Sequence, residues 1–182
     1  MLDPRITAAA ERLLTLGKVQ REPVPVRQLA KLAGALVRRG TLPEDLSGFL
    51  LRQADGTIIG VNTDHSETRQ RFTIAHEIGH LVLHPQQSYV DRRFFPIHFR
   101  DQRSSRAEDL VEIQANQFAA DLLMPKRLLE AAVGRKGIDI EDQPEVERVA
   151  QRFGVSTQAL TYRLINLQLA RSTTPPKKSS KR

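Results

Sequence analysis

The sequence predicts an α+β fold in which a short, mainly antiparallel sheet of about three strands is combined with helices. Two apolar runs, 48–52 and 57–61, are separated by four residues that end in Asp55-Gly56. An Asp-Gly pair between two apolar runs is a strong signal for a β-hairpin. A third strand is expected at 35–39, and segments with helical periodicity lie on both sides of these strands.

Helix boundaries are predicted from capping residues, prolines and glycines along the chain. Asp3 or Pro4 begins the first helix, and Pro85 stops the helix that begins near Glu67. Ser156 is suited to cap the last helix. The expected helices are 3–17, 26–32, 67–84, 105–123, 125–134, 144–153 and 156–169.

Composition excludes several classes of protein. The 182 residues are 40% hydrophobic and include no cysteine, so any metal ion must be bound by nitrogen and oxygen atoms. No apolar run approaches the length of a membrane span, and the N-terminus lacks the apolar stretch of a secretory signal. We therefore expect a cytoplasmic protein of bacterial type without a membrane partner. The sequence does not indicate an oligomeric state.

The predicted organisation is a core domain at 1–135, a helical extension at 136–170 packed on the core, and a disordered basic tail at 171–182. The formal net charge is +7, but five of these charges lie in the tail, which contains no acidic residue. The rest of the chain carries +2, which is ordinary for a globular domain. The basic composition is therefore weak support for nucleic-acid binding by the folded part.

The functional centre is predicted in the helix at 67–84, which contains His76-Glu77-x-x-His80. Histidines four residues apart share one helix face and are separated by about 6 Å along the axis, so both rings can reach one metal ion. Glu77 is then placed to accept a proton from a water molecule that the metal activates. Gly79 costs about 1 kcal/mol relative to alanine in a helix, which indicates a close neighbour there.

A catalytic zinc ion takes three protein ligands, so a third donor is needed. In the helix at 105–123, Glu108, Asp109 and Glu112 lie on or near one stripe, and periodicity alone does not choose between them. Asn116, one turn after Glu112, favours Glu112 because its amide could orient a ligand histidine. A set of two histidines and one glutamate suits Zn²⁺ and also admits Mn²⁺ or Fe²⁺.

His84 continues the polar stripe of the first of these helices. It lies eight residues after His76, which is about 12 Å along a continuous helix and too far for both to bind one ion. Nitrogen–metal bonds are only about 2 Å long, and no glycine turn brings the chain back. We therefore expect His84 beside the site or at the surface, without a bond to the metal.

The two helices resemble the paired motifs of the ImmA/IrrE family of bacterial metallopeptidases, in the segments QRFTIAHEIGHLVLH and VEIQANQFAADLLMP. The resemblance covers about 25–169 and takes in Ser47-Gly48 and Gly60-Val61-Asn62. It implies a small zincin-like metallopeptidase domain with the helical extension after it. It also implies roles for five residues, with Glu77 as general base, Asn116 beside a ligand, and a metal bound by His76, His80 and Glu112.

Members of this family cleave helix-turn-helix repressors, which releases mobile-element or stress-response genes. The resemblance therefore implies a Zn²⁺-dependent endopeptidase whose protein partner is a repressor of the XRE type. The substrate chain is expected to lie extended along an edge of the sheet. The oxyanion of the reaction needs a further donor, and the sequence does not rank the candidates Tyr89, His84, His98 and Tyr162.

The segment 85–105 shows no clear periodicity and carries four aromatic residues among four arginines. A loop of about 20 residues in a compact domain is either functional or disordered. Aromatic and arginine side chains together could grip a polypeptide or a nucleic acid. We interpret the segment as a mobile lid.

A competing function is that of a DNA-binding or toxin–antitoxin-type regulator in which the metal is structural. The helices at 144–153 and 156–169 have the spacing of a helix-turn-helix motif, with Gly154 in the turn. The outward positions of the second helix offer a single cation among Thr157, Gln158, Thr161 and Arg163. We therefore interpret the pair as packed on the core, with direct DNA contact as the less favoured reading.

Overall fold

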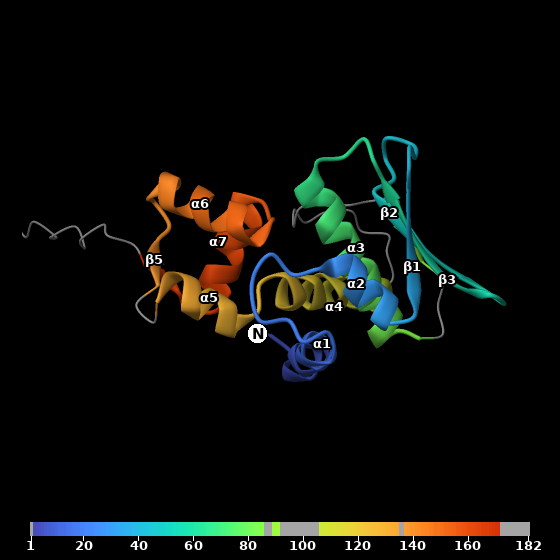
Figure 1. The fold of residues 1–182 in the computed structure, drawn as a ribbon, viewed down its shortest axis with the longest axis horizontal. Coiled ribbons are helices and arrows are strands. Elements are labelled where there is room, and N and C mark those ends of the chain that lie inside the picture. The colour runs from blue at the N-terminus through green and yellow to red at the C-terminus, as the bar shows by residue number, and fades with distance from the viewer. Residues whose placement is uncertain (1, 86–88, 92–105, 135–136, 172–182) are drawn as a thin grey trace, which may run out of the picture.

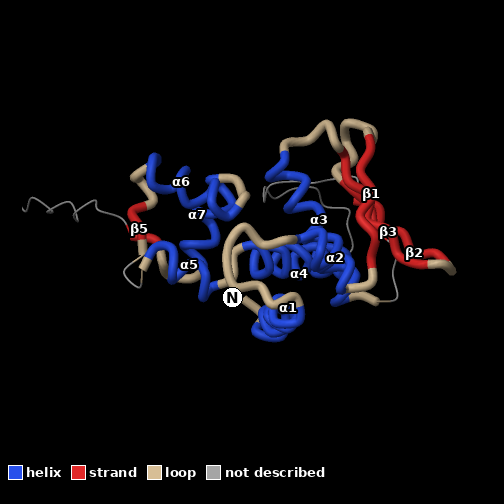
Figure 2. Tube along the Cα trace, in the orientation of Figure 1, coloured by secondary structure: helices blue, strands red, loops and turns tan. Residues whose placement is uncertain are grey.

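The structure is a computed structural model that describes residues 2–85, 89–91, 106–134 and 137–171. Within these ranges the chain forms seven helices and six strands (Figures 1 and 2). The helices are α1 (Pro4–Leu16), α2 (Val26–Leu32), α3 (Glu67–Leu83), α4 (Arg106–Leu123), α5 (Lys126–Val133), α6 (Gln143–Phe153) and α7 (Thr157–Asn166). The strands are β1 (Ala35–Gly40), β2 (Gly48–Gln53), β3 (Gly56–Asn62), β4 (Tyr89–Asp91), β5 (Ile138–Asp139) and β6 (Ala170–Arg171).

The main sheet has the strand order β1-β3-β2-β4 and contains the predicted hairpin. Strands β2 and β3 are antiparallel, with Gln53 paired to Gly56, and Gly56 adopts a positive φ of 147°. The sheet is mainly antiparallel as predicted, since two of its three pairings are antiparallel, but it has four strands and includes one parallel pair. Strand β1 pairs with β3 in parallel, and β4 adds a fourth strand antiparallel to β2. The described part is therefore α+β with a mixed sheet.

Two short features were not predicted because they leave no periodic pattern in the sequence. Strands β5 and β6 contain two residues each and pair in parallel. Strand β4 lies inside the segment predicted as a lid, so that interpretation is wrong at 89–91, where the chain pairs with the edge of β2. Of the rest of that segment, 86–88 and 92–105 lie outside the described residues, as does the tail at 172–182. Arg171, predicted as the first residue of the disordered tail, instead pairs with Asp139 in β6.

The end of β3 fixes the loop that leads into β2. Asn62 is completely buried, and the two hydrogens of its side-chain amide Nδ2 are shared among three loop carbonyl oxygens, those of Leu42, Pro43 and Leu46, at 3.3, 3.3 and 3.0 Å. Each such bond contributes about 1 kcal/mol, and an unpaired buried amide would cost more. The loop therefore delivers Gly48, the first residue of β2, to a fixed position beside α3.

Helix α3 packs on one face of the sheet, and α4 packs against α3 (Figure 1). Ile74 and Ile78 of α3 and Phe118 and Leu122 of α4 are among the completely or almost completely buried side chains between these layers. Burial of each contributes about 1.5–3 kcal/mol. Among the described residues, none of the helices has the length and apolar composition needed to cross a bilayer.

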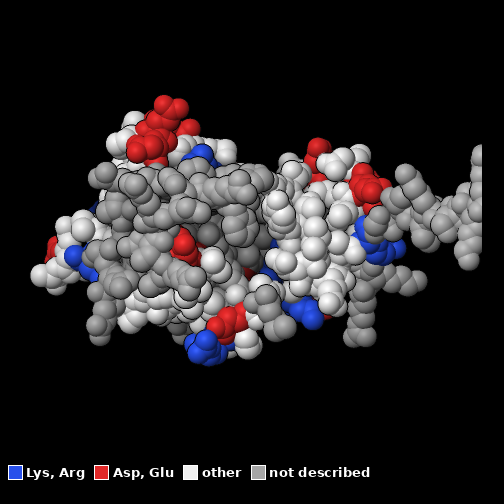
Figure 3. Space-filling view, turned by 180° about the vertical axis from the view of Figure 1, so that it is seen from behind, with Lys and Arg blue, Asp and Glu red and all other residues white. Residues whose placement is uncertain are grey.

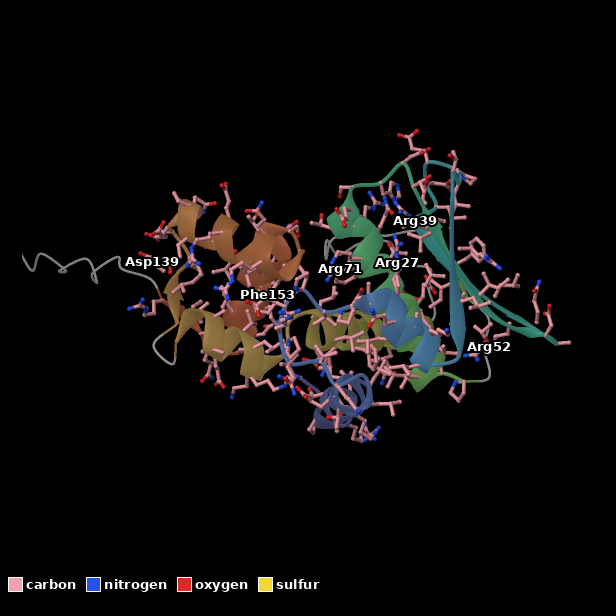
Figure 4. All side chains as sticks on the ribbon, in the orientation of Figure 1. Arg27, Arg39, Arg52, Arg71, Asp139 and Phe153 are labelled. Atoms are coloured by element: carbon pink, nitrogen blue, oxygen red, sulfur yellow. The ribbon has the colours of Figure 1, made fainter. Side chains whose placement is uncertain are left out.

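Helices α6 and α7 occupy the opposite end of the long axis from the sheet (Figure 1). Gly154 ends α6 in the left-handed conformation with φ of 63°, and Ser156 caps α7 as predicted, accepting from the backbone N of Ala159 at 3.2 Å. Arg71 of α3 points toward this turn (Figure 4), and its Nε donates to the Gly154 carbonyl at 3.0 Å. The turn is thus tied to the helix that carries the two histidines. The domain boundary at 135 stays a prediction.

Arg163 does not lie on the outward face of α7, and its predicted orientation is wrong. It is 3% exposed, with NH1 at 2.6 Å from Asp121 Oδ1 and Nε donating to the Met124 carbonyl at 3.1 Å. Asp121, in α4, also accepts from Thr7 Oγ1 of α1 at 2.8 Å. A partner 42 positions earlier in the chain therefore turns this arginine inward, and the other outward positions named above carry no charge.

Candidate metal site

Helix α3 buries a polar stripe. The helix begins after Ser66, whose Oγ accepts from the backbone N of Arg69 at 3.4 Å, and Glu67 lies in its first turn, where the helix dipole favours a carboxylate. His76 and His80, one turn apart, are only 1% and 0% exposed. Burial of polar rings is unfavourable unless their nitrogens have partners, so a neighbouring element must supply them.

Helix α4 approaches α3 closely because Gly79 has no side chain. A Cβ at Gly79 would lie 3.1 Å from both the Cα and the carbonyl oxygen of Ala115, and 3.3 Å from Phe118 Cβ. Carbon atoms in contact are usually about 3.5–4.0 Å apart. The expected close neighbour at Gly79 is therefore confirmed. Its consequence is that Glu112 and Asn116 of α4 lie opposite the two histidines.

Three side chains meet between the helices, and we call His76, His80 and Glu112 the donor cluster. The Nε2 atoms of the two histidines are 2.9 Å apart. Glu112 Oε2 is 3.2 Å from His76 Nε2, and Oε1 is 3.3 Å from His80 Nε2. Ligand bonds of 2.0–2.1 Å around a tetrahedral zinc ion place the donors about 3.3–3.4 Å apart. The two separations between Glu112 and the histidines therefore suit one ion with a fourth position left for another ligand, and the Nε2–Nε2 separation would have to widen by about 0.4 Å.

Asn116 indicates why a cation fits the donor cluster. Its Oδ1 lies 3.0 Å from His76 Nδ1, and a carbonyl oxygen only accepts, so Nδ1 carries the hydrogen. The neutral ring then turns the lone pair of Nε2 toward the Glu112 carboxylate. Two acceptors 3.2 Å apart require a proton or a metal ion between them. The buried nitrogens and the carboxylate are thus a chemically suitable set for a divalent ion.

The protonation states also suit metal binding. Burial alone would raise the pKa of Glu112, but in the metal-free site hydrogen bonds and charge from the protonated forms of His76 and His80 outweigh burial and lower this pKa from 4.5 to about 2. A bound cation would take the place of those protons. Burial lowers the pKa of His80 below its ordinary value of 6.5. A metal ion binds carboxylate and neutral imidazole, so both shifts favour the binding forms at neutral pH.

Glu77 lies beside the donor cluster and outside it. The residue is completely buried, and a Cβ at Gly48 would lie 3.8 Å from its Oε1 and 2.4 Å from Thr73 Cγ2. Gly48 therefore leaves space where the start of β2 meets the stripe of α3. Within the described residues, the group of possible metal ligands consists of His76, His80 and Glu112 alone. The base and ligand roles of these residues stay predictions.

The other candidate ligands either lie apart from the donor cluster or have side chains outside the described residues. Asp109 is exposed and does not belong to the donor cluster, and the side chain of Glu108 lies outside the described residues. His84 caps the C-terminus of α3, with its ring centroid 5.9 Å from that of His80. Its position agrees with the expectation of a residue beside the site.

The structure does not identify the oxyanion donor among the candidates. His98 and the side chain of Tyr89 lie outside the described residues. Tyr162 of α7 is 46% exposed and lines a shallow surface pocket with four polar residues, Gln143, Thr157, Gln158 and Thr161. That pocket contains no residue of the donor cluster. Of the four candidates, His84 is the one that the described residues place beside the cluster.

Comparison with known proteins points to one family. Residues 30–165 match the IrrE N-terminal-like domain. The chain is 32% identical over 165 residues to the radiation response metalloprotease IrrE of Deinococcus deserti, covering 83% of this chain and 54% of that protein. Identity to IrrE of Deinococcus radiodurans is 31% over 107 residues, covering 59% and 30%. Identity to uncharacterized immunity region protein 2 of Bacillus phage phi105 is 28% over 120 residues, covering 66% and 68%.

A solved structure shares the fold. It is a transcriptional regulator of Mycobacterium tuberculosis, with a TM-score of 0.61 and 18% identity, covering 97% of this chain and 49% of that one. At this level of identity the likeness concerns the fold alone. The chain spans about half the length of that regulator and of the Deinococcus deserti protein.

Proposed function

The chain belongs to the IrrE N-terminal-like domain family, and on that premise we propose that it is a metal-dependent endopeptidase that cleaves a helix-turn-helix repressor. The resemblance seen in the sequence is confirmed, and with it the assignment to a family with metalloprotease members. The observation that carries the hydrolytic activity is the donor cluster beside the buried carboxylate of Glu77.

The chemistry follows from the arrangement of these side chains. A Zn²⁺ ion held by the donor cluster would supply a Lewis acid that lowers the pKa of water from about 16 to about 7 and polarises the scissile carbonyl. Glu77 accepts the proton of the attacking water and later donates it to the leaving amine. Asn116 keeps the His76 ring in the tautomer whose Nε2 lone pair can bind the ion. The same donors suit Mn²⁺.

The extended substrate would pair with the sheet on its β4 side. Strand β4 joins β2 with Val90 opposite Phe49 and Asp91 opposite Gly48, the residue that lies beside Glu77. A peptide that adds to this edge, or takes the place of β4, brings its backbone toward the general base. This orientation is part of the proposal and follows from the order of the strands.

The repressor as substrate rests on the names of the relatives. One is a radiation response metalloprotease and another an immunity region protein. Both names are consistent with a protease that controls gene expression, and cutting a repressor would derepress stress-response or mobile-element genes. A cytoplasmic location, where the repressor meets its DNA, belongs to the same proposal.

The test of hydrolysis is Glu77→Gln, which keeps the shape of the side chain and removes the base. We expect unchanged metal content and circular dichroism, with cleavage of a candidate helix-turn-helix repressor reduced by at least about 10²–10⁴-fold. Glu67→Gln, an exposed change in the first turn of the same helix, is the matched control and should cut normally. Equal cutting by the Glu77→Gln protein would contradict the mechanism.

The second candidate function is a DNA-binding regulator with a structural metal. The turn at Gly154 and the structural likeness to a transcriptional regulator favour it. Against it, the inward position of Arg163 leaves the named outward positions of α7 uncharged, and on the face in Figure 3 the Lys and Arg of this part lie in separate small patches. Sequence-specific DNA binding by a protein lacking 171–182 would favour this function, whereas we expect that protein to keep its peptidase activity and to show no sequence-specific DNA binding.

A further inference from the structure

Glu112 is the member of the donor cluster that packing restrains least. Its side chain is 45% exposed, whereas the side chains of His76 and His80 are 2% and 0% exposed. The same turn of α4 carries Leu110 and Ile113, which are 58% and 60% exposed. Hydrophobic burial therefore contributes little at this turn, so a polar contact here would add to the restraint that Gly79 and Ala115 supply one turn later.

His84 makes such a contact. It is the C-cap of α3, and its backbone N–H donates to the His80 carbonyl at 3.0 Å. Its ring centroid lies 5.9 Å from that of His80, whose Nε2 is 3.3 Å from Glu112 Oε1. Burial lowers the pKa of the His84 imidazole, and a hydrogen bond with the backbone of Val111, the residue directly before Glu112, acts in the opposite direction. Arg52 of β2 donates through NH2 to the His84 carbonyl at 3.3 Å. His84 is thus held by the sheet on one side and contacts α4 on the other.

Two contacts between the helices therefore lie on either side of Glu112 in the sequence. Gly79 meets Ala115 three residues after Glu112, and His84 meets Val111 one residue before it. We propose that His84 is a positioning residue that holds the Val111 backbone and so keeps the Glu112 carboxylate within reach of His76 and His80. The inference rests on the proposed metal site, and in it His84 binds neither metal nor substrate.

The test uses the metal-free full chain and Zn²⁺ alone as the probe. His84→Leu fills the space without a donor, and we expect the dissociation constant for Zn²⁺ in a chelator competition to rise about 10–100-fold. His84→Asn and His84→Gln offer an N–H near the two ring-nitrogen positions, and at least one should restore the wild-type constant. Amide hydrogen exchange over 110–113 should accelerate in metal-free His84→Leu and return to the wild-type rate in the rescuing variant.

His65→Leu is the matched control, because His65 is a half-buried histidine before the opposite end of α3. It should leave Zn²⁺ affinity and exchange over 110–113 unchanged. If His84→Leu bound Zn²⁺ with wild-type affinity, the inference would be overturned. This holds also if its cleavage slowed, because a loss of cleavage alone would mean that His84 contacts the reacting atoms. Equal losses in the Leu, Asn and Gln variants would also overturn it. Failure of the wild-type protein to bind Zn²⁺ would instead refute the proposed metal site itself.

Discussion

Gly79→Ala tests whether the distance between α3 and α4 sets the geometry of the donor cluster. The new Cβ would lie 3.1 Å from two backbone atoms of Ala115, whereas contacts below about 3.5 Å are repulsive. We expect α4 to retreat locally by about 0.4 Å to relieve this contact. The separations of 3.2 and 3.3 Å between Glu112 and the histidines would then approach about 3.6–3.7 Å, beyond the spacing for a tetrahedral ion.

Two opposing effects determine the stability of this variant. Alanine improves helix propensity by about 1 kcal/mol, and overpacking costs about 1–3 kcal/mol, so the free energy of unfolding should fall by about 0–2 kcal/mol. Metal sites tolerate changes of only about 0.2 Å in ligand distance, so Zn²⁺ affinity should fall at least about tenfold. The substitution therefore affects metal binding more than folding.

The assay combines urea unfolding of the metal-free protein with Zn²⁺ titration under conditions in which both proteins are folded. Gly40→Ala is the control, because a Cβ there would meet nothing within 4 Å. It should leave Zn²⁺ affinity unchanged. A Gly79→Ala protein that is more stable than the wild type and binds Zn²⁺ equally well would refute the reasoning.

Two further predictions concern stability. Metal-free protein should lose stability on acidification, because the folded-state pKa of Glu112 is about 2 rather than 4.5 and that of His80 is below 6.5. The loss of stability should begin below about pH 6.5, because the histidine of the unfolded state takes up its proton first, and it should continue from pH 4.5 toward 2. Urea unfolding at pH 7, 5.5 and 4 measures the free energy of unfolding, and an increase on acidification would contradict the prediction. Arg163→Met should lower the free energy of unfolding by about 3–5 kcal/mol, because Asp121 then remains as a buried charge without its partner. The double variant Arg163→Met with Asp121→Leu should recover part of that loss in urea unfolding. If the losses of the two single variants simply added in the double variant, the two side chains would not be coupled.

Local signals in the sequence were sufficient for most elements. Asp3 caps α1, Val26–Leu32 is helical as expected, and α3 ends before Pro85. These boundaries depend on capping groups and on the missing N–H of proline, which act within a few residues. The position of His76 and His80 on one helix face was predictable for the same reason, because residues four apart lie one helical turn from each other.

Features that depend on contacts between residues far apart in the sequence could not be predicted from local patterns. Glu112 and Asp109 share a stripe of α4, and the contact of Gly79 with Ala115 fixes which of them faces α3. Arg163 looked outward from its position in α7, but Asp121 of another helix pairs with it in the interior. The three residues of β4 depend on the edge of β2 rather than on a pattern of their own.

Zinc content per chain tests the central claim most directly. Elemental analysis after removal of unbound metal should find about one ion in the wild-type protein and in Asp109→Ala, whose side chain is exposed outside the donor cluster. Glu112→Ala should retain far less, because it removes one of the three donors. Full occupancy in Glu112→Ala together with loss of the ion in Asp109→Ala would contradict the account.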